Sequence, residues 1–131
     1  MKYNRLIPEL TVTNIDRSKN FYTELLGFEI EYERAEDKFI FLSLEEAQIM
    51  IEEFRRDGWN VADMRFPFGR GINFSIEVDE IELIDQNILQ RNSPLYRPLM
   101  TNKYESNGEE IIQREFLVQD PDGYLLRITQ E

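Results

Sequence analysis

The chain contains the same pattern twice, and this internal duplication limits the folds that it can adopt. Segments 41–52 and 116–127 align at an offset of 75 positions, and each reads as two short apolar strands joined by a tight polar turn. Upstream, segments 10–15 and 76–81 align at an offset of 66, and each leads from a strand into an amphipathic helix. A period this long is untypical of solenoid repeats. Two copies therefore indicate paired halves of one domain.

Length and composition bound the class of protein. The 131 residues fit a single domain spanning 1–131, and a hydrophobic content of 41% suffices for one core of ordinary size. The sequence shows no long apolar run and no signal-peptide pattern. We therefore expect a cytoplasmic protein with no membrane partner.

Two gaps in the composition exclude several kinds of site. Without Cys, the chain has no disulfide framework, no thiolate nucleophile and no thiolate zinc site. Without His, it lacks the commonest metal ligand and the side chain that titrates nearest to neutral pH. A general base would have to be Glu, Asp or Lys, and no spacing marks one.

The net charge of −11 is the strongest compositional signal. It argues against a nucleic-acid partner, because binding to a phosphate backbone requires clustered Lys and Arg. An acidic surface instead attracts a cationic ligand. The alternative interpretation, that acidity serves solubility alone, stands beside it.

Hydrophobic periodicity predicts the order βαβββ in each copy. In the first copy we expect a strand at 5–13, a helix at 15–26 and strands at 28–34, 38–44 and 48–53. In the second we expect a strand at 72–78, a helix at 80–90 capped by Asp79 and Glu82, and strands at 99–104, 111–119 and 124–130. The predicted fold class is α+β, with module one at about 1–53, an aromatic and charged linker at 54–71 and module two at about 72–131.

Each predicted strand has one face against its module's helix and one face turned away. Alternation assigns to the helix side Leu10, Val12, Ile40, Leu42, Ile49, Ile51, Phe74, Ile76, Leu126 and Ile128. It assigns to the opposite face Ile7, Glu9, Thr11, Phe39, Phe41, Gln48, Met50, Glu52, Asn73, Ser75, Arg114, Phe116, Leu125 and Arg127. The second set mixes aromatic, polar and charged side chains, as the lining of a ligand-binding hollow does.

Several motifs, taken in order, resemble the vicinal oxygen chelate superfamily, which groups glyoxalase I, bleomycin resistance proteins and extradiol dioxygenases. These motifs are VTNIDRS at 12–18, FY at 21–22, LLGF at 25–28, FGRG at 68–71, FLV at 116–118 and DPDG at 120–123. The resemblance covers almost the whole chain. It implies two βαβββ modules curled into paired half-barrels, usually in a homodimer whose clefts can draw on both chains.

Enzymes that this chain resembles hold a divalent metal with two side chains from each module. The resemblance places these four positions at Ile7, Glu52, Asn73 and Arg127. One carboxylate and one amide beside a guanidinium do not provide the donors that a divalent cation requires. We therefore expect neither a metal nor another cofactor. An ion pair between Glu52 and Arg127 across the hollow is a hypothesis for what replaces the metal.

The residues at 68–74 and 124–127 look most like the bleomycin-resistance branch, whose members bind a bulky cationic glycopeptide in a metal-free, aromatic-lined cleft. Planar rings and carboxylates suit such a ligand. The candidates for stacking are Phe41, Trp59, Phe66, Phe68 and Phe116, and the candidates for charge are Glu9, Glu52 and Asp63. Met50, Asn73 and Arg127 complete the expected lining.

Plainer interpretations compete with these. Trp59, the only Trp, is either a ligand platform or a lid over a dimer seam. Phe66 and Phe68 could simply anchor the linker to the core. Gly69 and Gly71 fit a turn better than a phosphate loop, because no helix with the required Lys follows. The carboxylates of the DPDG segment are ordinary turn chemistry.

Three function classes stay open. The first is a metal-independent binding protein that sequesters an aromatic or cationic molecule, including a glycopeptide antibiotic, and so contributes to antibiotic resistance. The second is a glyoxalase-like lyase, isomerase or dioxygenase with an atypical or absent metal site. The third is a domain without a small-molecule role. Ile7 and Arg127 favour the binding protein over the enzyme, because they occupy family metal positions without being metal ligands. The fold by itself cannot choose between these classes, because it hosts many chemistries.

Overall fold

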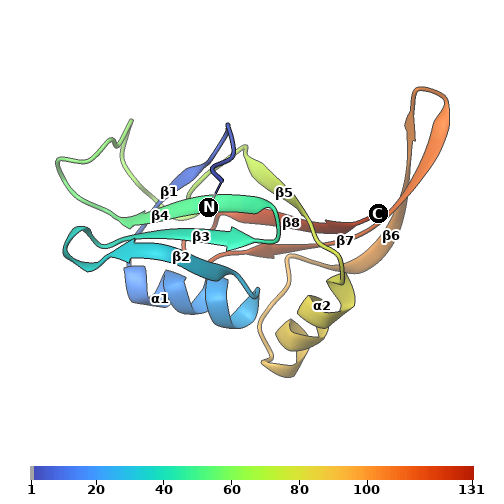
Figure 1. The fold of residues 1–131 in the computed structure, drawn as a ribbon, viewed down its shortest axis with the longest axis horizontal. Helices are drawn as coiled ribbons and strands as arrows, with labels where there is room; N and C mark the ends of the chain where they lie inside the picture. The colour runs from blue at the N-terminus through green and yellow to red at the C-terminus, as the bar shows by residue number, and fades with distance from the viewer. Residues whose placement is uncertain (1) are drawn as a thin grey trace.

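The computed structural model describes residues 2–131 and shows an α+β fold built from two similar modules (Figure 1). Module one contains β1 (Glu9–Val12), α1 (Ile15–Asn20) with a π-helical continuation (Phe21–Leu25), β2 (Glu29–Arg34), a 3-10 turn (Ala35–Asp37), β3 (Phe39–Leu44) and β4 (Ala47–Glu53). Module two contains β5 (Asn73–Glu77), α2 (Ile81–Gln90), β6 (Arg97–Ser106), β7 (Glu109–Gln119) and β8 (Leu125–Gln130). The predicted duplication of βαβββ is confirmed.

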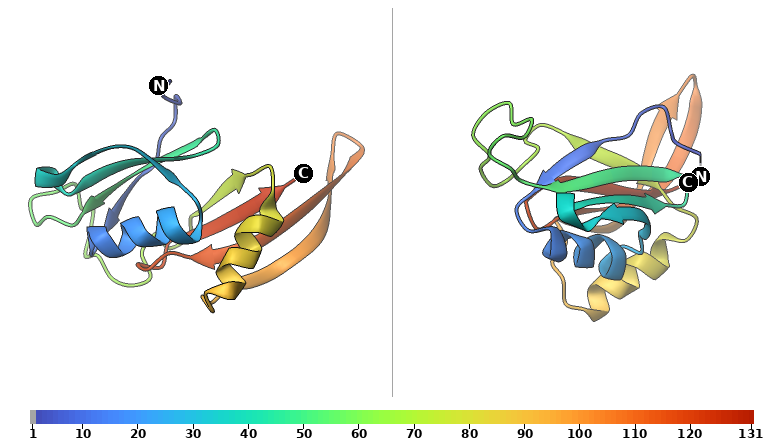
Figure 2. Two further views of the ribbon diagram at one scale, coloured as in Figure 1. Left: turned by 60° about the horizontal axis from the view of Figure 1, so that its bottom comes forward. Right: turned by 60° about the vertical axis from the view of Figure 1, so that its left-hand side comes forward.

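Both modules form a four-stranded mixed sheet with the same strand order. The orders are β1-β4-β3-β2 and β5-β8-β7-β6, in which the first pair of strands is parallel and the others are antiparallel. The two helices lie on the same side of the sheets (Figure 2). The opposite side is called the open face below.

A single apolar cluster fills the space between the sheets and the helices and takes side chains from both modules. Its fully buried members include Val12, Tyr22, Leu26, Leu42, Ile51, Ile81, Ile88, Phe116, Val118, Leu126 and Ile128. This shared core ties the modules together through the hydrophobic effect. Within residues 2–131, no helix has the length and hydropathy to cross a membrane.

Several details of the predicted elements are wrong. The first strand begins at Glu9 rather than at residue 5. Asp79 does not cap α2; its backbone N–H donates to Glu45, and the Ile81 N–H is satisfied by the Gln130 side chain at 2.8 Å. Strand β6 spans ten residues, and with β7 it forms a hairpin that projects beyond the sheet (Figure 1). The contacts of Asp79 and Ile81 join segments far apart in the sequence, which local patterns do not predict.

The turn between the last two strands is one residue longer in module two, and this changes the face of one strand. Leu44 and Ala47 flank two turn residues, whereas Asp120 and Tyr124 flank three and are joined by a 2.9 Å backbone hydrogen bond. Because strand side chains alternate, a shift of one residue transfers a strand's whole set to the opposite face. An alignment at one fixed offset therefore misplaces the residues of β7.

Phe116 and Arg114 were predicted on the open face, and both predictions are wrong. Phe116 lies opposite Ile128 and is completely buried in the core. Arg114 points toward α2, where its guanidinium lies 2.7 Å from the Glu82 carboxylate. The side chains of β7 that reach the open face are those of the alternate positions, Glu115 and Leu117, and Leu117 lies opposite Arg127.

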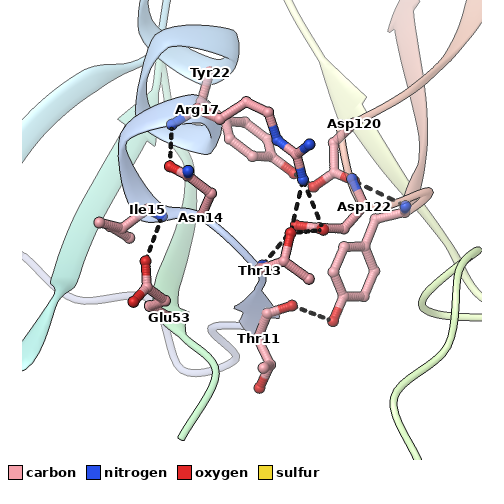
Figure 3. Close-up of polar contacts among 10 residues, drawn as sticks. Thr11, Thr13, Asn14, Ile15, Arg17, Tyr22, Glu53, Asp120 and Asp122 are labelled. Carbon is pink, nitrogen blue, oxygen red and sulfur yellow. Dashed lines mark hydrogen bonds and ion pairs between the residues drawn. The ribbon is translucent and has the colours of Figure 1, made fainter.

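The two modules are joined where each sends its last turn to the other, and Figure 3 shows the contacts made by the turn of module two. The Asp122 carboxylate accepts hydrogen bonds from the Thr13 N–H at 3.1 Å and the Thr13 hydroxyl at 2.6 Å, and it pairs with Arg17 at 3.2 Å. In the reverse direction, the Glu45 carboxylate accepts the Asp79 N–H at 3.0 Å. The DPDG segment is therefore a junction between modules.

Asp120 lies at the centre of this junction. Its carboxylate accepts hydrogen bonds from the Tyr22 hydroxyl at 2.8 Å and from the Asp122 and Tyr124 N–H groups at 3.0 and 2.9 Å. Burial nevertheless raises the pKa of Asp120 from 3.8 to about 6, because desolvation of the charged form outweighs these hydrogen bonds.

This raised pKa predicts a pH-dependent contribution to stability. A carboxyl that binds its proton more tightly in the folded state stabilises the fold when protonated. The contribution of Asp120 is full below about pH 4 and is lost as the pH rises through about 6. Asp120→Asn keeps the shape without titrating. The free energy of unfolding of the wild type relative to this variant should fall by about 2–3 kcal/mol between pH 4 and pH 7, as measured by urea denaturation. A pH-independent difference would contradict the assignment.

Candidate ligand-binding site

A hollow of about 540 Å³ lies on the open face of module one, where β1 and β4 meet the linker. It is lined by Glu9, Thr11, Arg34, Glu52, Glu53, Arg55, Gly58, Trp59 and Asn60. Three residues predicted from sequence, Glu9, Glu52 and Trp59, thus share one hollow. Arg34, Arg55 and Asn60 were not singled out from sequence, because neither cations in a predicted acidic site nor a single linker amide carry a distinguishing pattern.

Strand pairing places two of the three carboxylates of the hollow, those of Glu9 and Glu52, close together. In the parallel β1–β4 pair, Glu9 lies beside Met50 and Thr11 beside Glu52, so Glu9 and Glu52 are diagonal neighbours on one face. Burial raises the pKa of Glu9, the negative charge of Glu52 raises it further, and nearby Arg34 and Arg55 lower it. Glu52 also pairs with Arg55 at 3.2 Å. The hollow thus holds Glu9 and Glu52, partly balanced by arginines, together with Glu53, which pairs with Lys38 at 2.8 Å.

An aromatic layer lies beside this hollow on the same face. Phe41 and Phe39 are almost completely buried, although both are outside the main core. Tyr32 stacks on Phe41 with ring centroids 5.4 Å apart, Tyr3 meets Phe41 edge-on at 5.4 Å, and the Arg34 guanidinium lies 4.2 Å from the Phe39 centroid. The open-face prediction for Phe41 is confirmed, but other side chains cover its ring.

The two tyrosines that cover Phe41, Tyr32 and Tyr3, were not predicted from the sequence. Tyr32 occupies an alternate position of β2, so the strand periodicity of segment 28–34 could have identified it. Tyr3 precedes the first strand and carries no local signal. It is held in place because the Asn4 N–H donates to the Gln48 side chain at 2.7 Å and the Gln48 amide donates to the Lys2 carbonyl at 2.7 Å.

The aromatic residues of the linker divide into exposed and buried groups. The Trp59 side chain is 95% exposed at the border of the hollow, and Phe66 is 66% exposed. Phe68 instead belongs to the core and meets the Tyr124 ring edge-on at 5.9 Å. Phe68 is therefore an anchor of the linker. Asp63 lies away from the hollow and pairs with Arg65 at 3.4 Å.

Module two carries a different, polar set on its open face, centred on the buried carboxylate of Glu115. Asn102 and the Tyr104 hydroxyl both donate to one Glu115 oxygen, the latter at 2.7 Å. The other oxygen lies 3.8 Å from the Arg127 guanidinium. The hypothesised pair between Glu52 and Arg127 is therefore wrong within residues 2–131, since each has a partner in its own module. Sequence analysis missed Glu115 because of the shifted face of β7.

The register also corrects one of the four family metal positions. Leu10 lies beside Ile51 and its counterpart Ile76 beside Ile128, so the module-one counterpart of Arg127 is Met50. Glu52 corresponds instead to Thr129. The four positions thus carry Ile7, Met50, Asn73 and Arg127, of which only exposed Asn73 offers an oxygen donor. This set does not fit a divalent metal. Elsewhere in the described chain, no three Asp or Glu side chains gather closely enough to hold one.

The partner of Arg127 can be tested by double-mutant cycles. Because Arg127 and Glu115 are close and Glu115 is buried, Arg127→Met and Glu115→Gln should show a coupling energy of about 1 kcal/mol or more in urea unfolding. The matched cycle of Arg127→Met with Glu52→Gln should show coupling near zero. Coupling only in the second cycle would overturn the assignment.

Comparisons with known proteins agree with this architecture. Residues 14–129 match the family model described as "Glyoxalase domain-containing protein 4-like, C-terminal domain". The chain is 29% identical over 130 residues to a bleomycin resistance protein from Geobacillus stearothermophilus, covering 95% of each sequence. It is similar in fold to TioX from Micromonospora sp. ML1, with a TM-score of 0.73 at 15% identity and 98% of both chains covered. It is also similar in fold to a glyoxalase/bleomycin resistance protein/dioxygenase from Alicyclobacillus acidocaldarius, with a TM-score of 0.68 at 21% identity and 97% and 90% of the two chains covered.

Because the family model spans most of the chain's length, the chain belongs to the glyoxalase/bleomycin resistance/dioxygenase superfamily.

Proposed function

We propose that this protein binds a small cationic, aromatic molecule without a metal and sequesters it in the hollow of module one. The observation that carries the proposal is the closeness of Glu9 and Glu52 beside the exposed ring of Trp59. Two neighbouring carboxylates repel each other, which is why Glu52 raises the pKa of Glu9. A bound cation would relieve this repulsion, so the site favours a positively charged ligand.

The indole of Trp59 supplies a second contact of matching chemistry. A cation within about 6 Å of an indole face is attracted by its quadrupole, and planar rings stack on the same surface. Because its side chain is 95% exposed, Trp59 can turn toward a ligand without losing packing. The residues proposed to contact the ligand are therefore Glu9, Glu52 and Trp59. Arg34, Arg55 and Asn60 complete the wall of the hollow and set its shape and polarity.

Similarity to a bleomycin resistance protein supports a glycopeptide antibiotic as one candidate ligand. The side chains at Ile7, Met50 and Arg127 support binding without a metal, because none of them offers an oxygen or neutral nitrogen ligand. Antibiotic resistance by stoichiometric capture would follow from such binding.

We also propose that the protein acts as a homodimer. Phe54, Trp59, Val61 and Phe66 all lie in the linker and are 44% to 103% exposed in the single chain. Several exposed apolar side chains in one surface segment mark an interaction site. A second copy of the chain is the partner that superfamily membership suggests.

A pair of probes of the same shape and different charge tests the proposed ligand class. Trimethylphenylammonium and the neutral tert-butylbenzene should be titrated while the fluorescence of Trp59, the only Trp, is recorded. The cation should bind at least tenfold more tightly than the neutral probe. Glu9→Gln or Glu52→Gln should weaken binding of the cation about tenfold, equivalent to about 1.4 kcal/mol. Bleomycin should be titrated in the same way.

The matched control is Glu46→Gln, an exposed carboxylate in the turn before β4 and outside the hollow. It should leave both affinities unchanged. Binding of the cation should also weaken as the pH falls through the raised pKa of Glu9, because protonation removes the attracting charge. Equal affinity for the two probes would overturn the proposed ligand class.

A further inference from the structure

The tip of the β6–β7 hairpin, which projects from the sheet of module two, is a turn formed by Asn107 and Gly108 (Figure 1). Both residues have left-handed backbone, with φ of 52° and 81°, and Ser106 pairs with Glu109 across them. These angles match a type I′ turn, for which Asn-Gly is a preferred sequence. Because Gly has no Cβ, the same sequence also lets the amide nitrogen of Gly108 approach the Asn107 side chain closely.

The surroundings of this turn leave both of its reactive groups free. Asn107 and Gly108 are exposed, and a Cβ added to Gly108 would meet no atom within 4 Å. Within residues 2–131, neither the Asn107 side chain nor the Gly108 N–H makes a hydrogen bond. Strand β6 packs mainly on β7, so the tip can open locally without disturbing the core.

We propose that Asn107 is a site of covalent modification in the folded protein, by deamidation through a cyclic imide. The Gly108 nitrogen gives its proton to a solvent base and bonds to the side-chain carbonyl carbon of Asn107. The bond from this carbon to the side-chain nitrogen then breaks, and the nitrogen leaves as ammonia with a proton from water. Water opens the imide at either carbonyl, which gives aspartate or isoaspartate. The reaction consumes one water, involves no oxidation, and is independent of the proposed ligand.

Hydrogen bonding distinguishes this turn from three other pairs that place Asn or Asp before a small residue, 57–58, 92–93 and 122–123. In each of them the second residue donates its backbone N–H to a carbonyl. The hydrogen bonds join Gly58 to Arg55 at 2.9 Å, Ser93 to Ile88 at 3.1 Å and Gly123 to Asp120 at 2.9 Å. Attack on the preceding side chain would first require this bond to break, so the fold protects these three pairs and leaves Asn107 reactive.

The product changes the charge and the geometry of the hairpin tip. A new carboxylate joins those of Glu105, Glu109 and Glu110. Lys103, the only cation between residues 100 and 113, already lies 3.7 Å from Glu110. Isoaspartate also adds one methylene to the main chain, which disrupts a turn of two residues. Because the tip lies outside the core, the modified protein stays folded and becomes a more acidic form of the same molecule.

Peptide mapping by mass spectrometry tests the site directly. Trypsin cleaves after Lys103 and Arg114, and Asn107 is the only Asn of the resulting peptide 104–114. After incubation of the folded protein at mildly alkaline pH, this peptide should show replacement of NH₂ by OH at Asn107 and contain both aspartate and isoaspartate. The peptide that contains Asn92 should stay unmodified. Asn107→Gln is the control, because its longer side chain would have to close a six-membered ring, and it should leave peptide 104–114 unmodified.

The same incubation in urea shows whether the fold selects the site. Unfolding releases the N–H groups of Gly58, Ser93 and Gly123 from their carbonyls. Isoaspartate formation at the three residues that precede them should therefore rise at least tenfold in urea, whereas the rate at Asn107 should change much less. Isoaspartate is located in each peptide by fragmentation.

Defined results would overturn the proposal. Modification of Asn107 in urea but not in the folded protein would show that the turn protects it. Equal rates at Asn92 and Asn107 in the folded protein would contradict the role given to hydrogen bonding. Asn107→Asp, which carries the charge of the product, should unfold at the same urea concentration as the wild type, and a marked loss of stability would contradict a folded product. Sedimentation velocity of the unmodified wild type is independent of these results, and a species with the mass of one chain would overturn only the proposed homodimer.

Discussion

The exchange of turns between the modules is the interaction on which the rest of the structure depends. The Asp122 carboxylate holds the end of β1 through Thr13, and Glu45 holds the backbone that leads into α2. These contacts fix one module against the other with both helices on one side, so that a single core can form between the sheets and the helices. Asp120 and the buried Tyr22 hydroxyl complete the arrangement at the point where the modules are closest. A carboxylate so buried is costly unless its hydrogen bonds are made, which favours one relative placement of the modules over others.

Much of this fold follows from local patterns. Alternation of apolar residues identified the strands, and the helical stripe before Gly27 identified the first helix, because these periods depend on the backbone alone. The core positions Leu10, Ile40, Ile51 and Ile128 were predicted for the same reason. The face of β7 was not, since a single additional residue in a turn reverses it while leaving the apolar pattern intact. Phe116 has an equally plausible place on either face when only the sequence is considered.

The candidate site was predicted in part. Glu9 and Glu52 come together because parallel pairing of β1 with β4 fixes their spacing, and Trp59 joins them because the linker returns over the end of β4. The partners Arg34 and Arg55 could not be anticipated, as long cationic side chains reach their contacts by rotamer choice rather than by position. Arg127 pairs with Glu115 instead of Glu52 because the longer turn of module two puts Glu115 on the open face of the same sheet. Equivalent positions of the two modules have diverged, so that one open face is aromatic and the other is a hydrogen-bonded polar network.

The segment that precedes β1 has a consequence for handling the protein. Lys2, Tyr3 and Asn4 lie against Gln48 and Phe41, directly over the aromatic layer of module one. A polyhistidine extension at this end would therefore deliver imidazoles to the open face of a protein that has none of its own. Metal taken up by such a preparation would be bound by the extension and not by the folded protein. A purification tag at the other terminus, or no tag, avoids this confusion.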